Sequence, residues 1–189
     1  MTVNSELASQ HLSAGDRLQK SGNFDEAIAQ YQKILALKTD EAVALNKIAE
    51  VYYAQQKFAE AIASCYQALR QQANFAAAYK TLGNILQAQG KIDAAIRAYS
   101  KAIEFDPNFV EAYVNLGSMF YKQGQLDDAI TYYQKSIVIQ PDLAVAYWNL
   151  GKSLEEQGRI NEGLFYQKKA LHLQPELEAR SNSVKNHTY

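Results

Sequence analysis

The sequence predicts an all-α fold, a solenoid of five tandem helix–turn–helix units. The first observation is a fixed period, because the three prolines, Pro107, Pro141 and Pro175, are spaced 34 residues apart. The second is that eight of the nine glycines follow the same period, in two series that begin at Gly15 and Gly22. A period of this length is typical of repeat arrays, and the apolar residues within each period are spaced as on a helix face.

The period divides most of the chain into units. We expect an N-terminal extension over residues 1–7 and a short polar tail or partial cap over residues 178–189. The five units between them are predicted at 8–41, 42–75, 76–109, 110–143 and 144–177.

The third unit shows the pattern of its first helix most clearly. Tyr79, Leu82 and Leu86 recur with the spacing of one helix face. Gly90 is expected to end this helix, since glycine tolerates the left-handed conformation common just after a helix.

The second helix of that unit follows at once. Asp93 lies near its predicted start, where a carboxylate suits the exposed backbone N–H groups. Ala95 and Tyr99 belong to its apolar face, and Pro107 turns the chain into the next unit because proline cannot continue a helix.

The other units keep the register with substitutions. The fourth repeats the pattern of the third, whereas the first has the weakest opening. The second has Gln56 and Ala73 in place of the glycine and the proline. The fifth has Gly163 and Gln167 where alanine and an aromatic residue are expected.

The pattern aromatic-x-x-Leu-Gly, then Ala-x-x-x-aromatic, then Pro, resembles the tetratricopeptide repeat. The third unit carries it as Tyr79, Leu82-Gly83, Ala95, Tyr99 and Pro107. In style the array is similar to the repeat regions of O-linked N-acetylglucosamine transferases. The resemblance implies a right-handed solenoid whose first helices line a concave binding groove.

Composition excludes several classes of protein. The 19 Lys and Arg residues against 20 Asp and Glu residues leave a net charge of −1, which does not favour nucleic acid as a partner. No apolar run is long enough to cross a membrane. No secretory signal is visible at the start, and we expect a cytoplasmic protein.

The search for catalytic chemistry is negative. The histidines His11, His172 and His187 share no metal-ligand spacing, and no phosphate loop or nucleophile elbow occurs. Cys65 stands at a core position of its unit and is expected to be a buried structural thiol. We therefore predict a protein that is not an enzyme and that needs no cofactor or metal.

Binding residues are expected on the first helix of each unit. The predicted peptide-binding residues are Lys47, Lys80, Asn84, Asn115, Tyr121, Trp148 and Asn149. Positive and negative groups nearly balance on this face.

Two binding modes are open. Lys80, Asn84 and Asn115 match the arrangement with which some family members hold the C-terminal carboxylate of a peptide, although Val145 and Asn149 stand where two further basic residues are expected. In the second mode Asn115 and Asn149, one repeat apart, grip a peptide backbone with their amides, as in the asparagine ladder of the transferases. Trp148 is then the natural aromatic anchor.

The C-terminal end of the array is expected to be incompletely covered. The last strong helix, predicted near residues 161–173, is expected to expose Leu164, Phe165 and Leu171. We therefore predict self-association through this end.

The leading functional hypothesis is a non-catalytic scaffold that binds an extended peptide or partner segment in its groove. The alternative is an N-terminal recruiting or oligomerisation region of a larger enzyme, such as a glycosyltransferase or methyltransferase. A designed or purely structural array is the third hypothesis.

Overall fold

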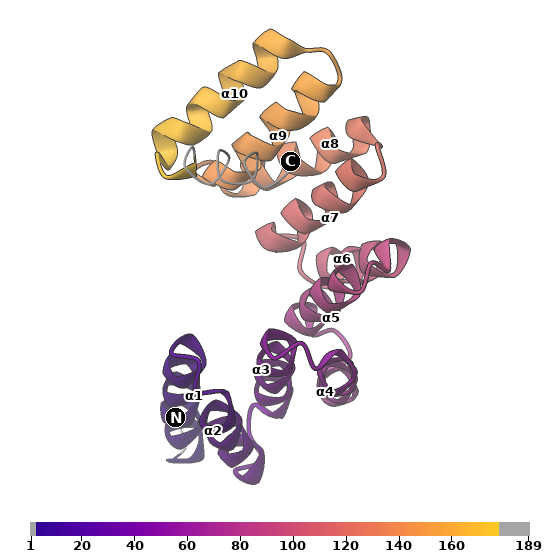
Figure 1. Ribbon diagram of the computed structural model, residues 1–189. Coiled ribbons are helices and arrows are strands. Elements are labelled where there is room, and N and C mark those ends of the chain that lie inside the picture. The colour runs from indigo at the N-terminus through magenta and orange to yellow at the C-terminus, as the bar shows by residue number, and fades with distance from the viewer. Residues whose placement is uncertain (1–2, 178–189) are drawn as a thin grey trace. The chain divides into compact units, whose positions relative to one another are not determined.

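The computed structural model describes residues 3–177 and is helical throughout, with no β-strand in that range (Figure 1). The helices follow one another in pairs: α1 (Val3–Lys20) and α2 (Phe24–Ala36), α3 (Glu41–Ala54) and α4 (Phe58–Gln71), α5 (Ala76–Ala88) and α6 (Ile92–Phe105), α7 (Val110–Lys122) and α8 (Leu126–Ile139), α9 (Ala144–Glu156) and α10 (Ile160–Leu173). The all-α class and the solenoid of helix pairs are confirmed.

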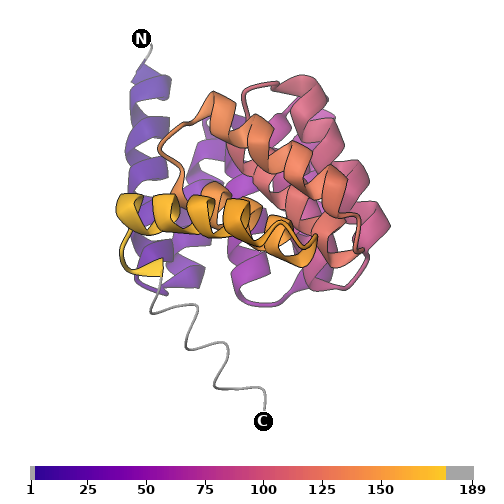
Figure 2. The same ribbon diagram turned by 90° about the horizontal axis from the view of Figure 1, so that it is seen from above.

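The chain divides into two compact units, Met1–Pro107 with the first three helix pairs and Asn108–Tyr189 with the last two. Helices α9 and α10 pack against each other: they lie side by side in Figure 1, and α10 lies in front of α9 in Figure 2. The five-unit division of the sequence stays a prediction. Residues 3–7, expected as an extension, are the start of α1, and the tail 178–189 lies outside the described residues.

The turn within each helix pair requires a left-handed residue. Gly22, Gly90, Gly124 and Gly158 have φ between 73° and 84° at this point. The exception is Gln56, which adopts φ 59° in the turn between α3 and α4. A side chain at positive φ is strained, so the second helix pair carries a local strain that the others avoid.

A second irregular turn joins α2 to α3. Lys38 and Asp40 both have φ 51°, and this turn lacks the proline found after α6, α8 and α10. Asp40 precedes the first residue of α3 but its side chain makes no capping hydrogen bond.

Within a pair, the two helices cross at a small residue of the first helix. A Cβ atom built on Gly83 would lie 2.5 Å from Cε1 of Tyr99, and one on Gly117 would lie 2.8 Å from Cε1 of Tyr133. Gly15 and Tyr31 make the same contact. The ring of the second helix therefore occupies the space that a Cβ atom would need.

Two helix pairs have different residues where their helices cross. In α3 and α4 the crossing residues are Ala49 and Cys65, a larger residue matched to a smaller one, and both are fully buried. In α9 and α10, Gly163 brings the backbones together, since its Cβ would lie 2.7 Å from the carbonyl oxygen of Gly151.

Successive pairs within each unit stack through apolar side chains. In the first unit, Ile34 of α2 shares a buried cluster with Ile48 and Val51 of α3. In the second unit, Ile130 of α8 is buried with Leu150 of α9. No pair buries its apolar faces alone, so each depends on its neighbours for stability.

We expect Gln56→Gly to stabilise the protein by about 1 kcal/mol, because glycine adopts positive φ without the clash that a Cβ atom creates. Urea denaturation followed by circular dichroism measures the change. The matched control is Gly90→Gln, which should destabilise by a similar amount since open space surrounds its Cβ position and only the backbone conformation matters. Equal stability of both variants and the parent would contradict the strain assigned to Gln56.

We expect Gly83→Ala to destabilise by roughly 1–3 kcal/mol, because the new Cβ atom overlaps the ring of Tyr99. The double variant Gly83→Ala/Tyr99→Cys reproduces the native Ala49–Cys65 pair and should recover part of the loss. Thermal denaturation of both variants and of Tyr99→Cys alone tests the coupling. Strict additivity of the two single effects would show that the residues do not share one packing site.

Candidate binding face

The first helices of the pairs in the first unit carry a chain of alternating charges. Lys47 Nζ on α3 lies 3.2 Å from Oδ1 of Asp16 on α1 and 3.4 Å from Oε2 of Glu50. Lys80 Nζ on α5 lies 3.6 Å from Oε1 of Glu50. The four charged side chains are 22–37% exposed, so they are screened less than a fully exposed surface pair. They connect three helices that are distant in sequence.

The carboxylate of Glu50 is the centre of this chain of charges. Besides the two lysines, Asn46 Nδ2 donates to its Oε1 at 3.3 Å and Thr81 Oγ1 donates at 3.5 Å. Asn46 and Thr81 are almost fully buried, which fixes the direction of both donors. Four donors from α3 and α5 thus surround one acidic group of the chain itself.

Buried tyrosines of the second helices reach the same face with their hydroxyl groups. Tyr31 donates to Asp16 Oδ1 at 2.8 Å, and Tyr99 donates to Asn84 Oδ1 at 2.8 Å. In the second unit, the Tyr133 hydroxyl lies 3.2 Å from Oγ of Ser118. Their place in the repeat predicts only a packing role for these tyrosines. The 15-residue spacing between each polar residue and its tyrosine is a signal that could have revealed the contact.

Burial changes the acidity of several groups next to this face. It raises the pKa of Tyr31, with a further rise from the hydrogen-bonded Asp16, and it raises the pKa of Tyr99. Burial also raises the pKa of the Cys65 thiol to about 12. Because the thiolate is the reactive form, this supports the prediction of an inert structural cysteine.

The residues predicted to capture a carboxylate are divided between the two units. Lys80 and Asn84 lie half-buried on α5, and Asn115 lies half-buried on α7. Lys80 is paired with Glu50, and the amide oxygen of Asn84 accepts from Tyr99. Joint action of the three stays a prediction.

The remaining predicted residues lie together in the second unit. Asn149 and Trp148 are on α9, which contacts α7, the helix that carries Asn115 and Tyr121. A hydrogen bond to Glu156 and burial raise the pKa of Tyr121 to about 12. Trp148 is half-buried and packs against the cluster that contains Tyr147, so it is both a core and a surface residue rather than simply exposed.

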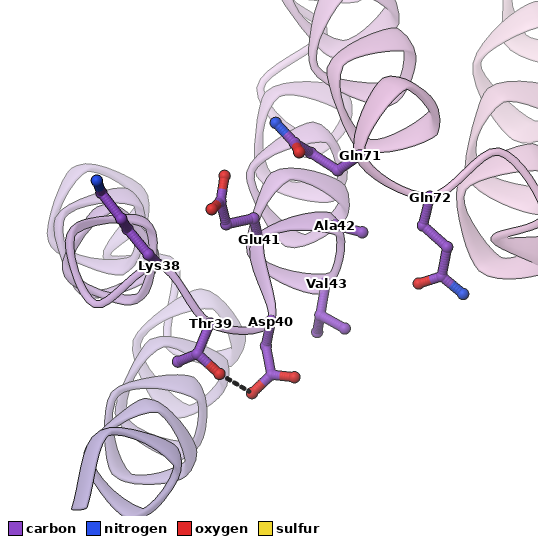
Figure 3. Close-up of a pocket in the computed structure, with 8 residues that line it drawn as sticks. All are labelled: Lys38, Thr39, Asp40, Glu41, Ala42, Val43, Gln71 and Gln72. Carbon is purple, nitrogen blue, oxygen red and sulfur yellow. Dashed lines mark hydrogen bonds between the residues drawn. The ribbon is translucent and has the colours of Figure 1, made fainter.

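Two cavities lie in the first unit. One of about 480 Å³ is lined by Asp16, Lys47, Glu50 and neighbouring residues of α1, α2 and α3. The other, of about 340 Å³, lies between the α2–α3 turn and the end of α4 (Figure 3). There Thr39 donates to the Asp40 carboxylate at 3.4 Å, and the Lys38 amine points away from it (Figure 3).

Residues 3–177 contain no cluster of three or more His, Cys, Asp or Glu side chains that could hold a metal ion. No helix in the same range combines the length and apolar character needed to cross a bilayer.

The last helix exposes most of the apolar residues expected there. Leu164 is 43% and Phe165 is 63% exposed. Leu171 was expected to be exposed but is half-buried, because it packs against the cluster of Tyr147, Ala170 and Leu177. Self-association through this end stays a prediction.

Family models match most of the chain. A model described as TPR repeat matches residues 83–124 and 117–158, and two described as Tetratricopeptide repeat match residues 12–77 and 144–177. No curated protein matches the sequence.

Solved structures are similar over nearly their whole length. The crystal structure of MamA is 31% identical, with 87% of this chain and 96% of that chain covered and a TM-score of 0.71. YrrB, described as a TPR protein with an unusual peptide-binding site, is 22% identical and has a TM-score of 0.66, with 95% of this chain and 98% of that chain covered. A thermophilic TPR protein of Thermus thermophilus is 17% identical and has a TM-score of 0.74, with 94% of this chain and 97% of that chain covered. The last two likenesses show the fold alone.

We expect the stability of the protein to fall as pH rises above about 9. The folded state holds the Cys65 proton and, above about pH 10, the protons of Tyr31 and Tyr99 more tightly than the unfolded state does. The contribution of these protonated groups to the free energy of unfolding is therefore fully present below their pKa values in the unfolded state. It is lost progressively as the pH rises toward their pKa values in the folded state. Thermal melting between pH 7 and 11.5 measures the slope. Cys65→Ala should flatten the part between pH 9 and 10, whatever it does to stability at pH 7, and an unchanged slope would contradict the role of the thiol.

Proposed function

Because the chain belongs to the tetratricopeptide repeat family, we propose that it is a non-catalytic scaffold that binds an extended peptide or partner segment on the first helices of its pairs. The observation that carries the proposal is the set of polar side chains on these helices, which the fold holds in place. Tyr31 fixes Asp16 and Tyr99 fixes Asn84, while Lys47 links α1 to α3. Side chains that are already ordered lose little entropy when a ligand binds, so such a face is suited to recognition.

The charge pattern favours peptide backbone over a terminal carboxylate as the bound group. In the first unit, Glu50 already takes the place that a ligand carboxylate would occupy beside Lys80. A carboxylate would have to displace it and leave an acidic group without its donors. A peptide backbone is uncharged and could bind without displacing Glu50 from the lysines.

The second unit offers the matching groups. Asn115 and Asn149 stand on neighbouring first helices, and an asparagine amide can donate to a backbone carbonyl and accept from a backbone N–H group. Trp148 lies beside Asn149 in the sequence and is half-buried, so part of its ring surface is available to an incoming side chain. YrrB, a structural neighbour, is itself described as having a peptide-binding site, which is consistent with this role.

The fluorescence of Trp148, the single tryptophan, tests the proposal directly. We expect a pool of extended peptides to change its emission, equally with free and with amidated C-termini, because no terminal carboxylate is required. Asn115→Ala and Asn149→Ala should each weaken binding by about 10-fold, as loss of paired amide contacts costs on the order of 1 kcal/mol or more.

The matched control is Gln134→Ala, which removes an exposed amide from the second helix α8 and should leave binding unchanged. If amidation of the peptide or the Lys80→Ala substitution abolished the response, the terminal carboxylate would be the bound group, and recognition of the backbone would be contradicted. No response to any peptide would count against the groove as the binding site.

A further inference from the structure

Glu50 differs from its equivalents in the way its side chain is held. Asp16, Asn84 and Ser118 stand at the same position of their helix pairs, at multiples of 34 residues from Glu50. In each of those pairs the hydroxyl group of a tyrosine on the second helix lies 2.8–3.2 Å from this residue. The pair that contains Glu50 has Cys65 in place of the tyrosine, and a thiol is a much weaker donor than a hydroxyl group. The Glu50 carboxylate is held by the first helices instead.

Four donors of the chain itself converge on the Glu50 carboxylate. Its Oε1 accepts from Asn46 at 3.3 Å and from Thr81 at 3.5 Å. The ammonium groups of Lys80 and Lys47 lie 3.6 Å from Oε1 and 3.4 Å from Oε2, respectively. A carboxylate has about four lone-pair sites, so these donors use its whole capacity. We call the four donor residues the carboxylate cradle.

The donors of the cradle depend on an acceptor inside the protein. Asn46 is 4% exposed and Thr81 is 1% exposed, so water cannot replace a lost partner at little cost. Lys47 also pairs with Asp16, and the cradle without Glu50 therefore has two positive charges beside one remaining negative charge. Two ammonium groups and two neutral donors around one point have the chemistry of a site for a single carboxylate.

With Glu50 in place, the same groups offer nothing to an acidic ligand. Both ammonium groups are paired, and a second carboxylate would meet the negative charge of Glu50 at close range. Oδ1 of Asn46 is buried and accepts no hydrogen bond from the described residues. The unmet need beside Glu50 is therefore for a donor, which a carboxylate cannot supply.

We propose that Glu50 is a specificity-determining residue of the binding face: it fills the carboxylate cradle with a group of the chain itself and so excludes acidic groups of a partner segment. The proposal rests on the proposed function for the existence of a bound segment, whereas the chemistry of the cradle stands without it. A segment that lies over α3 and α5 is uncharged or basic at this point. Removal of the Glu50 side chain turns the cradle into a site for an external carboxylate.

Rescue of Glu50→Ala by acetate tests the cradle without any peptide. Thermal denaturation is measured in sodium chloride and in sodium acetate of equal ionic strength, up to about 0.5 M. We expect acetate to raise the melting temperature of E50A by about 3 °C or more relative to chloride, once its concentration is roughly ten times its dissociation constant. The parent should show only the small general effect of acetate, because its cradle is filled. Circular dichroism confirms folding, and Glu50→Ser, which opens nearly the same space, replaces E50A if that variant does not fold.

The matched control is Glu50→Gln, which removes the same charge but leaves an amide in the cradle. Its melting temperature should respond to acetate as that of the parent does, because no space has been opened. Glu104→Ala is a second control, since it also leaves a lysine without its carboxylate. The ion pair of Glu104 with Lys101, at 2.8 Å, is exposed, so water replaces the lost partner and no acetate-specific rise is expected.

A short peptide tests the exclusion of acidic ligands. Acetyl-tetraglycine is compared with a free and with an amidated C-terminus, and binding is followed by the NMR shift of the Thr81 backbone N–H group. We expect E50A to bind the free acid at least about 10-fold more tightly than the parent does, and the amidated peptide equally. If no peptide of any kind binds the parent, the proposed function fails, yet acetate still reports on the cradle.

Three results would overturn the proposal. One is an equal response of E50A and the parent to acetate, which would show that no carboxylate site lies beneath Glu50. Another is the same acetate response in E50A and E50Q, which would indicate an effect of net charge rather than an opened site. The third is a parent chain that binds the free-acid peptide as tightly as E50A does, which would show that Glu50 excludes nothing.

Discussion

Each helix pair is built on one steric constraint, the close approach of two helices over a residue with little or no side chain. Where the first helix has glycine, as at Gly83, the second helix places a tyrosine ring in the vacated space. Where it has Ala49, the ring is replaced by the smaller Cys65. In both cases the residue of the second helix fits the space that the first helix leaves, so the helix pairs can differ in sequence at the crossing.

The same constraint connects the core to the binding face. A tyrosine of the second helix whose ring lies over a glycine places its hydroxyl group beside the first helix, where it donates a hydrogen bond to Asp16 or Asn84. The second pair has a cysteine at this position and no hydroxyl to offer. There Glu50 is held by Lys47 of the same helix and by Lys80 of α5. The face is therefore ordered by core packing in some pairs and by ion pairs in another.

The first and last helices that the structure describes differ in the chemistry of their exposed residues. α1 exposes Gln10 and Arg17, whereas α10 exposes Ile160 and Leu164. A repeat architecture makes this difference visible, since every position can be compared with its equivalents in the same chain.

The succession of helix pairs could be predicted without coordinates, because the signals involved are local. Glycines such as Gly90 allow the left-handed turn, and prolines such as Pro107 prevent helix continuation, wherever they occur in space. The buried state of Cys65 also followed from its place in the repeat. The way in which the candidate binding residues are engaged could not be predicted. The pairing of Lys80 with Glu50 and the partial burial of Trp148 depend on distances between helices. Those distances are set by how closely the helices cross and stack, and no spacing along the chain encodes them.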